Sequence, residues 1–355
     1  NLRYEVPCKP KKNIVFVKTH KCASSTVQNM LLRYAKSNNL TVVLPILSRT
    51  HYLSRLLPFN RKMIAGAPWG HMEYNVFCHH AIFNEEEISA VMPKDTVYVS
   101  ILREPTRLFE SLYEYSNMNE FYNMTLTDYA AATRDPTKYE TLNKRAHGNM
   151  GRNQMLFDFG VKPALFENKT EIEKTIMKID RKFDLIMIAE YFDQSLILLK
   201  DLMCWDFDDI VSLRINARDD RFKHSVAPDT AYLLRQWNAG DQILYNVFVE
   251  KLKRKIADYG LEKMKTEVQR LTEKRKFWYN TCISEEVDAS HLTRYRVWSN
   301  KVLGFVLKQG IQNKTCEDLV RPEREFTNYM RQRQMMKALF TNEHKPEFPL
   351  PDFLN

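Results

Sequence analysis

Basic and hydroxyl-bearing side chains crowd one short segment near the start of the chain. Residues Ile14–Val17 are apolar and mostly β-branched, as expected of a buried strand. Lys18, His20 and Lys21 follow this run, and a helical pattern extends from residue 24 to about residue 34. The N-terminus of a helix presents unpaired N–H groups and the positive end of its dipole, so it binds anions. The segment therefore predicts a phosphate site flanked by two lysines.

The loop after this strand differs from the phosphate loop of nucleoside triphosphatases. That loop has the pattern G-x-x-x-x-G-K-[ST], whose glycines let the backbone wrap the phosphates. Here residues 18–27 contain no glycine, and Lys21 precedes the hydroxyl run at residues 24–26 by three positions. A loop without glycines offers a smaller set of backbone N–H groups, which predicts that it binds a single 5′-phosphate and not a triphosphate. The alternative is an ordinary strand-to-helix turn with a capping serine and solvated lysines.

A second strand-like run, residues 96–102, leads directly into Arg103. Ser111 lies eight positions further on, about two turns into the helix that this segment predicts. A guanidinium fork with a hydroxyl nearby is a good receptor for a second phosphate. In the alternative, Arg103 pairs on the surface with Glu104 or Glu110. Two anion sites at two strand ends predict a nucleotide with separate 5′- and 3′-phosphate groups.

Two consecutive histidines end a third strand-like run, residues 75–80. An imidazole can abstract a proton near neutral pH, and a strand end could bring it to the same cleft. Successive strand residues point to opposite faces, so we expect one of the two rings to enter the site. We favour His80 as the base, with His79 as its competitor.

These motifs resemble those of sulfotransferases that use PAPS (3′-phosphoadenosine 5′-phosphosulfate). The loop at residues 18–27 is similar to their 5′-phosphosulfate loop, and the spacing of Arg103 and Ser111 is similar to their 3′-phosphate element. Within this superfamily the resemblance is strongest to the Golgi galactose-3-O-sulfotransferase family, which includes galactosylceramide sulfotransferase. It extends to residues 75–80 and 190–205 and covers most of the chain.

The resemblance implies transfer of a sulfuryl group from PAPS, as co-substrate, to a glycan hydroxyl. The implied acceptor is the 3-OH of a terminal β-galactoside on a glycolipid or glycoprotein. Lys21 is expected to stabilise the leaving phosphate oxygen, and His80 to act as the base. Lys18 and His20 are expected to contact the sulfonate or the acceptor, although His20 could instead cap or pack. The expected donor-binding residues are Lys21, Cys22, Ala23, Ser24, Ser25, Thr26, Val27, Arg103 and Ser111.

The alternation of strand-like and helical patterns predicts an α/β fold. Four apolar runs, residues 14–17, 75–80, 96–102 and 183–189, each precede a helical pattern. Continuous apolar strands of this kind indicate a P-loop-like central parallel sheet flanked by helices, with ligands at the carboxyl ends of the strands. The helix after the last run is predicted over residues 192–203.

The chain is expected to form one domain over residues 1–355. A PAPS-binding α/β core at 13–227 would carry a packed helical C-terminal extension at 228–355. Helices in that extension are predicted over residues 229–254, 258–277 and 323–341, with a less regular segment at 278–322. The basic 323–341 helix suits a solvated face or a membrane surface. The polar clusters 151–154 and 214–218 suit either ligand contact or solvated loops.

Composition limits the classes of partner. The 355 residues carry a net charge of +9, which favours anionic ligands, but no nucleic-acid recognition module is present. No stretch approaches 18 consecutive apolar residues, so no membrane span is predicted. The six cysteines lack metal-ligand spacing, so no metal is expected. A disulfide between Cys282 and Cys316 is the favoured pairing.

Four glycosylation sequons favour a secretory compartment, at Asn39, Asn123, Asn168 and Asn313. With the family resemblance they predict a Golgi-lumen ectodomain of a type II membrane protein, whose N-terminal anchor would precede Asn1. The oligomeric state is left open.

Three other functions fit part of the pattern. A different carbohydrate sulfotransferase, such as a uronic-acid 2-O-sulfotransferase, would use the same donor site. A kinase would need an acidic magnesium ligand at a strand end, and none is evident beside the loop. A non-catalytic glycan- or heparin-binding protein would need only the positive charge.

Overall fold

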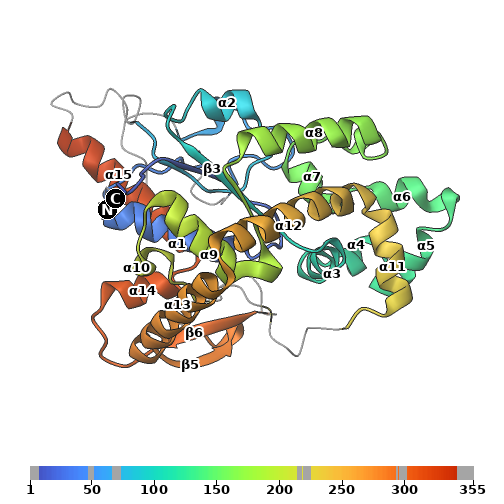
Figure 1. Ribbon diagram of the computed structural model, residues 1–355. Helices are drawn as coiled ribbons and strands as arrows, with labels where there is room; N and C mark the ends of the chain where they lie inside the picture. The colour runs from blue at the N-terminus through green and yellow to red at the C-terminus, as the bar shows by residue number, and fades with distance from the viewer. Residues whose placement is uncertain are drawn as a thin grey trace.

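The structure is a computed structural model that describes residues 8–46, 52–65, 73–213, 218, 225–292, 295 and 302–341. At its centre is a four-stranded parallel sheet in the order β2-β1-β3-β4 (Figure 1). The strands are β1 (Ile14–Val17), β2 (Val76–Phe77), β3 (Val97–Leu102) and β4 (Leu185–Ile188). All four are buried along their whole length, which explains their uninterrupted apolar runs. The predicted α/β class is confirmed.

The order of the strands reverses at the centre of the sheet. The chain leaves β1 toward β2 on one side, and later leaves β3 toward β4 on the other. Val17, the last residue of β1, pairs with Ser100 of β3. A reversal of this kind leaves a crevice at the carboxyl ends of the two central strands. The loop at residues 18–23 and Arg103 both begin there.

Helices cover both faces of the sheet. Figure 1 shows α1 (Ser24–Ser37) and α9 (Phe192–Met203) on one side, with α2 (Glu85–Ser89) and α8 (Lys169–Lys182) on the other. The bounds of α9 are those predicted, and α1 begins at the predicted residue. Along the chain, the segment that connects β3 to β4 contains α3 (Pro105–Tyr115) and several shorter helices. These are α4 (Met118–Tyr122), α5 (Leu126–Ala132), α6 (Tyr139–Asn143) and α7 (Gln154–Asp158).

The single helix predicted over residues 229–254 is wrong. The chain forms α11 (Pro228–Trp237) and α12 (Ala239–Tyr259), with a break at Asn238 (φ −101°, ψ 36°). The side chain of Asn238 accepts a hydrogen bond from the backbone N–H of Asn153 and donates to the carbonyl of Leu234. These contacts with a distant loop stabilise the break, so a local helical pattern does not reveal it.

The remaining elements form the C-terminal layer. They are α13 (Leu261–Cys282), the antiparallel strands β5 (Ile283–Asp288) and β6 (Leu303–Leu307), α14 (Lys314–Val320) and α15 (Glu323–Thr341). The bounds of α15 are those predicted. A short helix α10 (Phe207–Ile210) follows α9. None of the helices in the described ranges is both long and apolar enough to cross a membrane.

The C-terminal layer shares its apolar core with the sheet. Phe326 and Met330 of α15 belong to the same buried cluster as β1 and β3. The predicted disulfide Cys282–Cys316 is present and joins the end of α13 to α14. A second disulfide, Cys8–Cys204, was not predicted; it ties the segment before β1 to the end of α9.

Candidate active site

A cavity of about 580 Å³ is located at the carboxyl ends of the central strands. Its walls combine the loop after β1, the ends of β2 and β3, and parts of α3, α9, α13 and α15. Most of the residues predicted for the site line it, namely His20, Lys21, Ala23, Ser24, Ser25, Thr26, His80, Arg103 and Ser111. The two predicted anion elements therefore share one cavity.

The loop turns without glycine by placing two other residues in the left-handed region. Lys21 has φ 57° and Ala23 has φ 62°, conformations that cost non-glycine residues on the order of 1 kcal/mol. Ala23 is the N-cap of α1, and no side chain caps the helix there. The hydroxyl of Ser24 donates instead to the carbonyl of Thr19, 2.6 Å away. The alternative of a serine-capped turn is therefore wrong.

Lys21 lines the cavity together with the arginines Arg103 and Arg218. Its ammonium stacks on the ring of Tyr115, 3.6 Å from the centroid. Burial, followed by the charges of Arg103 and Arg218, lowers the pKa of Lys21 to about 7. An incoming anion would offset all three effects, so the site favours a phosphate over a neutral ligand.

Arg103 faces the cavity and not the surface. Its guanidinium donates to the carbonyl of Lys21 at 2.9 Å and so fixes the loop. The carboxylates of the surface alternative are engaged elsewhere, because Glu104 caps α3 and Glu110 makes a bidentate pair with Arg218 at 2.6 Å. Pro105 starts α3, which turns the buried Ser111 toward the same cavity.

Three further arginines line the cavity; Arg107 and Arg275 were not predicted, whereas ligand contact was one of two alternatives for the cluster that contains Arg218. Arg107 follows Arg103 by one turn, whereas Arg218 and Arg275 come from distant parts of the chain. Arg275 pairs with Asp193 of α9, which also lines the cavity. Arg218 belonged to a polar cluster with no distinguishing spacing, and Arg275 had the pattern of a solvated helix face.

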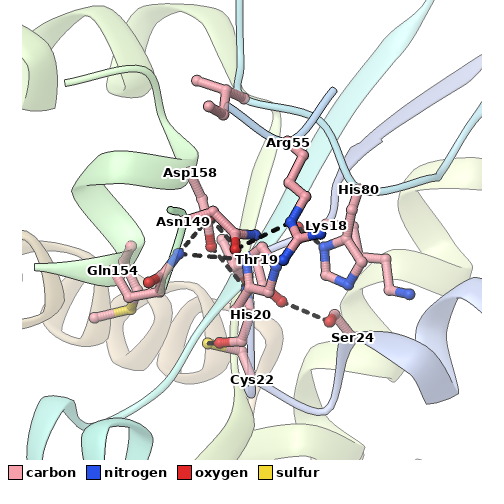
Figure 2. A network of polar contacts seen from close by, with 12 residues as sticks. Lys18, Thr19, His20, Cys22, Ser24, Arg55, His80, Asn149, Gln154 and Asp158 are labelled. Carbon is pink, nitrogen blue, oxygen red and sulfur yellow. Dashed lines mark hydrogen bonds and ion pairs between the residues drawn. The ribbon is translucent and has the colours of Figure 1, made fainter. Parts of the chain in front are cut away.

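His20 is held by a buried carboxylate. Its backbone N–H donates to one oxygen of Asp158, and its Nδ1 lies 2.8 Å from the other (Figure 2). Gln154 donates to the same carboxylate at 3.0 Å, and the hydroxyl of Tyr52 lies 3.2 Å from Nε2 of His20. A carboxylate on Nδ1 fixes a proton there, so in the neutral ring Nε2 accepts from Tyr52. Asp158 and Tyr52 were not predicted, because nothing in their local sequence marks them.

His80 stacks on His20, with ring centroids 4.1 Å apart and an interplanar angle of 15°. Its Nδ1 lies 3.0 Å from the backbone carbonyl of Lys18. A carbonyl can only accept, so Nδ1 carries a proton, and in the neutral ring Nε2 keeps its lone pair. His79 is fully buried and contacts Thr327 of α15 at 2.9 Å. Strand β2 ends at Phe77, before both histidines, and of the two rings His80 is the one that lines the cavity.

Lys18 does not reach the cavity. Its side chain is fully buried, and its ammonium binds Gln28 at 2.8 Å and Glu323 at 2.6 Å. The sequence led us to expect that Lys18 contacts the sulfonate or the acceptor directly, and its buried position does not allow this contact. The polar cluster at 151–154 is likewise structural at Arg152, which donates to the carbonyl of Trp237.

Cys22 and Val27 are also buried away from the cavity. The thiol of Cys22 donates to the carbonyl of His20, and burial raises its pKa, so it is an inert filler. These two residues can contribute to an anion site only through their backbone. Among the described residues, no group of three or more potential ligands is placed to hold a metal ion.

An anion cavity at the switch point of a parallel sheet, with an imidazole beside it, suits a transferase that uses a phosphorylated nucleotide. The sequence model of the galactose-3-O-sulfotransferase family matches residues 3–334. Human galactose-3-O-sulfotransferase 2 is 32% identical over 329 residues, which cover 89% of this chain and 82% of the relative. Human galactosylceramide sulfotransferase is 30% identical over 333 residues, covering 90% and 78%.

Bovine galactose-3-O-sulfotransferase 3 is 32% identical over 350 residues, covering 94% of this chain and 81% of the relative. The chain belongs to the galactose-3-O-sulfotransferase family.

Proposed function

We propose that this protein transfers a sulfuryl group from PAPS to the 3-OH of a terminal β-galactoside on a glycolipid or glycoprotein. Family membership and the names of the relatives support the reaction and the acceptor. The observation that carries the proposal is the convergence of Lys21, Arg103 and His80 on one cavity, from three separate strand ends.

The proposed donor site follows the distribution of charge. The N–H groups at the start of α1 and the ammonium of Lys21 would hold the 5′-phosphosulfate. Arg103 and Ser111 would hold the 3′-phosphate, with Arg107 and Arg218 adding positive charge nearby. A nucleotide with phosphate groups at both positions would engage both elements at once.

The proposed roles of the residues follow from their protonation. PAPS supplies a sulfuryl group that is already activated by its phosphate leaving group. His80 accepts the proton of the acceptor hydroxyl at Nε2 while the acceptor oxygen bonds to sulfur. The electron pair of the broken S–O bond remains on the phosphate oxygen, where the ammonium of Lys21 stabilises it. Asp158 keeps the ring of His20 against His80 and orients its Nε2 toward Tyr52.

The proposed location is the Golgi lumen. Two disulfides support an oxidising compartment, since such bonds rarely persist in the cytosol. The asparagines of the four sequons are exposed, as glycan attachment requires.

The test measures transfer of labelled sulfate from PAPS to a panel of β-galactosides, uronates and glycolipids. We expect sulfate at position 3 of the galactosides, and a loss of activity of about 100-fold or more in Lys21→Ala and His80→Ala. The matched controls are Lys178→Ala and His291→Ala, because both residues are exposed and neither lines the cavity. Melting protection by 3′,5′-ADP without added metal checks the donor site. Absence of transfer to every galactoside would refute the proposal.

A further inference from the structure

The C-terminal helix α15 delivers a carboxylate into the cavity. Glu323, the first residue of the helix, lines the cavity together with His20, His80 and Tyr52. Its side chain is 15% exposed, so it is accessible from the cavity and otherwise enclosed. The proposed reaction assigns no role to this group.

Lys18 fixes the position of this carboxylate. The Lys18 ammonium lies 2.6 Å from Oε2 of Glu323, and a second bond to Gln28 holds the ammonium from the other side. Burial lowers the pKa of Lys18, and the charge of Glu323 opposes that shift. Breaking a buried ion pair leaves one charge uncompensated, which is strongly unfavourable. The contact with Lys18 therefore holds the side chain of Glu323 in one place.

The same lysine joins the carboxylate to the proposed base. The backbone carbonyl of Lys18 accepts from His80, and its side chain reaches Glu323. One turn along α15, Thr327 donates to the carbonyl of Glu323 and contacts His79, the neighbour of His80. The start of α15 is thus fixed to the strand end that carries the base.

The charges around the cavity show which kind of group Glu323 can bind. The anion side is lined by Lys21, Arg103, Arg107 and Arg218, and a carboxylate would repel a phosphate or sulfonate there. Glu323 instead lies against Lys18, and its charge, after burial, raises the pKa of both Tyr52 and Tyr115. Tyr115 also contacts the ammonium of Lys21. A carboxylate accepts strong hydrogen bonds from neutral hydroxyl groups. The geometry suits a sugar hydroxyl beside the one that His80 deprotonates.

We propose that Glu323 binds the acceptor sugar, accepting a hydrogen bond from a galactose hydroxyl adjacent to the 3-OH. Lys18 is the positioning residue for this carboxylate. The inference rests on the proposed galactoside sulfotransfer and adds the part of the site that recognises the sugar. The hydroxyl is that of carbon 2 or carbon 4, the two neighbours of carbon 3.

The experiment compares kcat/KM for a β-galactoside with its 2-deoxy and 4-deoxy analogues, using wild type, Glu323→Gln and the control Glu325→Gln. Glu325 lies in the same turn of α15 but does not line the cavity. We expect wild type and the control to lose about 10- to 100-fold on one of the two analogues. Glu323→Gln should lose a similar factor on the parent galactoside and show no further loss on that analogue. Its affinity for 3′,5′-ADP should stay within about threefold of wild type.

A second variant guards against a folding defect, since Glu323→Gln leaves the Lys18 ammonium without its charge partner. Lys18→Met/Glu323→Gln removes both charges, and its 3′,5′-ADP binding and melting temperature report whether the fold is intact. The same loss of discrimination is expected in this double variant. The inference is overturned if the Glu323 variants discriminate between the acceptors as wild type does. It is also overturned if the double variant no longer binds 3′,5′-ADP, because Glu323 is then structural. Failure of wild type to sulfate any galactoside would instead refute the proposed function.

Discussion

Lys21 combines two properties that an anion site with a catalytic cation requires. It projects from a left-handed backbone position and lines the cavity, and its ammonium stacks on Tyr115. Its pKa of about 7 means that the protein alone holds the ammonium only partly charged at neutral pH. The charge of the site therefore depends on the ligand.

The first prediction concerns the pH dependence of nucleotide binding. Lys21 has a lowered pKa in the free protein, and a bound phosphate raises it, so binding takes up a proton above pH 7. We expect the contribution of Lys21 to the affinity for 3′,5′-ADP to be constant below about pH 6 and to fall by up to tenfold per pH unit above 7. Titration calorimetry between pH 6 and 9 measures this, with Lys21→Met as the control. An unchanged slope in Lys21→Met would assign the proton to another group.

Individual site residues could be predicted from the sequence where a recognisable strand directly precedes them. Lys21, Arg103 and His80 each follow a recognisable strand, and all three line the cavity. Lys18 shares the same local pattern yet points elsewhere, because its partner Glu323 lies 305 residues away. Asp158 could not be predicted, since its role exists only through a contact with His20 across 138 residues. The catalytic roles themselves remain predictions.

Helix α7 is the element that presents Asp158 and Gln154 to His20. It is only five residues long, and its start is held from outside by Asp241 of α12. The two oxygens of Asp241 accept from the backbone N–H groups of Met155 and Leu156, at 3.0 and 2.9 Å. Burial raises the pKa of Asp241 to about 7 despite these bonds. A helix this short depends on such contacts, because its own hydrogen bonds are few.

The second prediction is that Asp241→Ala lowers the free energy of unfolding by about 2–3 kcal/mol. Two buried N–H groups would lose their acceptor, and each costs at least 1 kcal/mol when unsatisfied. Urea unfolding at pH 6 measures the change. The control is Asp258→Ala, an exposed aspartate of the same helix, for which little change is expected. Equal effects of the two substitutions would contradict the role given to Asp241.

The regular elements were predicted where a local pattern was sufficient. Buried strands gave continuous apolar runs, and α9 and α15 have the predicted bounds. The break at Asn238 and the hairpin of β5 and β6 were missed. The first depends on a hydrogen bond to Asn153, and the second has one exposed and irregular strand without a clean alternation.

Across the whole molecule, two disulfides close loops of very different length. Cys8 and Cys204 are separated by 196 residues, and Cys282 and Cys316 by 34. The entropy lost by the unfolded chain grows with the length of the closed loop. The longer loop includes the whole central sheet, whereas the shorter one includes only the hairpin region.

The third prediction follows from these lengths. Replacing both cysteines by alanine should lower the free energy of unfolding by about 4 kcal/mol for Cys282/Cys316 and about 5 kcal/mol for Cys8/Cys204. Urea unfolding gives both values, and non-reducing mass spectrometry verifies the remaining bond. Cys78→Ala serves as the control, because that buried thiol is free and its removal leaves both bonds intact. A change below 1 kcal/mol in either pair would show that its bond does not constrain the chain.

The overall architecture was predictable because a parallel sheet with helices on both faces has few ways to connect its strands. The residues that complete the wall of the cavity were not predictable in this way. Arg218, Arg275 and Glu323 all join it from the C-terminal half, and each does so through a contact that no local pattern encodes.

The ion pair between Lys18 and Glu323 also sets an order of events during translation. At usual rates of synthesis, the ribosome needs roughly 15 to 60 s to add the 305 residues between them. Until then the lysine has no anionic partner, so a nascent chain cannot bury it without a penalty. Lys18 directly follows β1, so the turn after this strand lacks its ion pair until α15 has been synthesised.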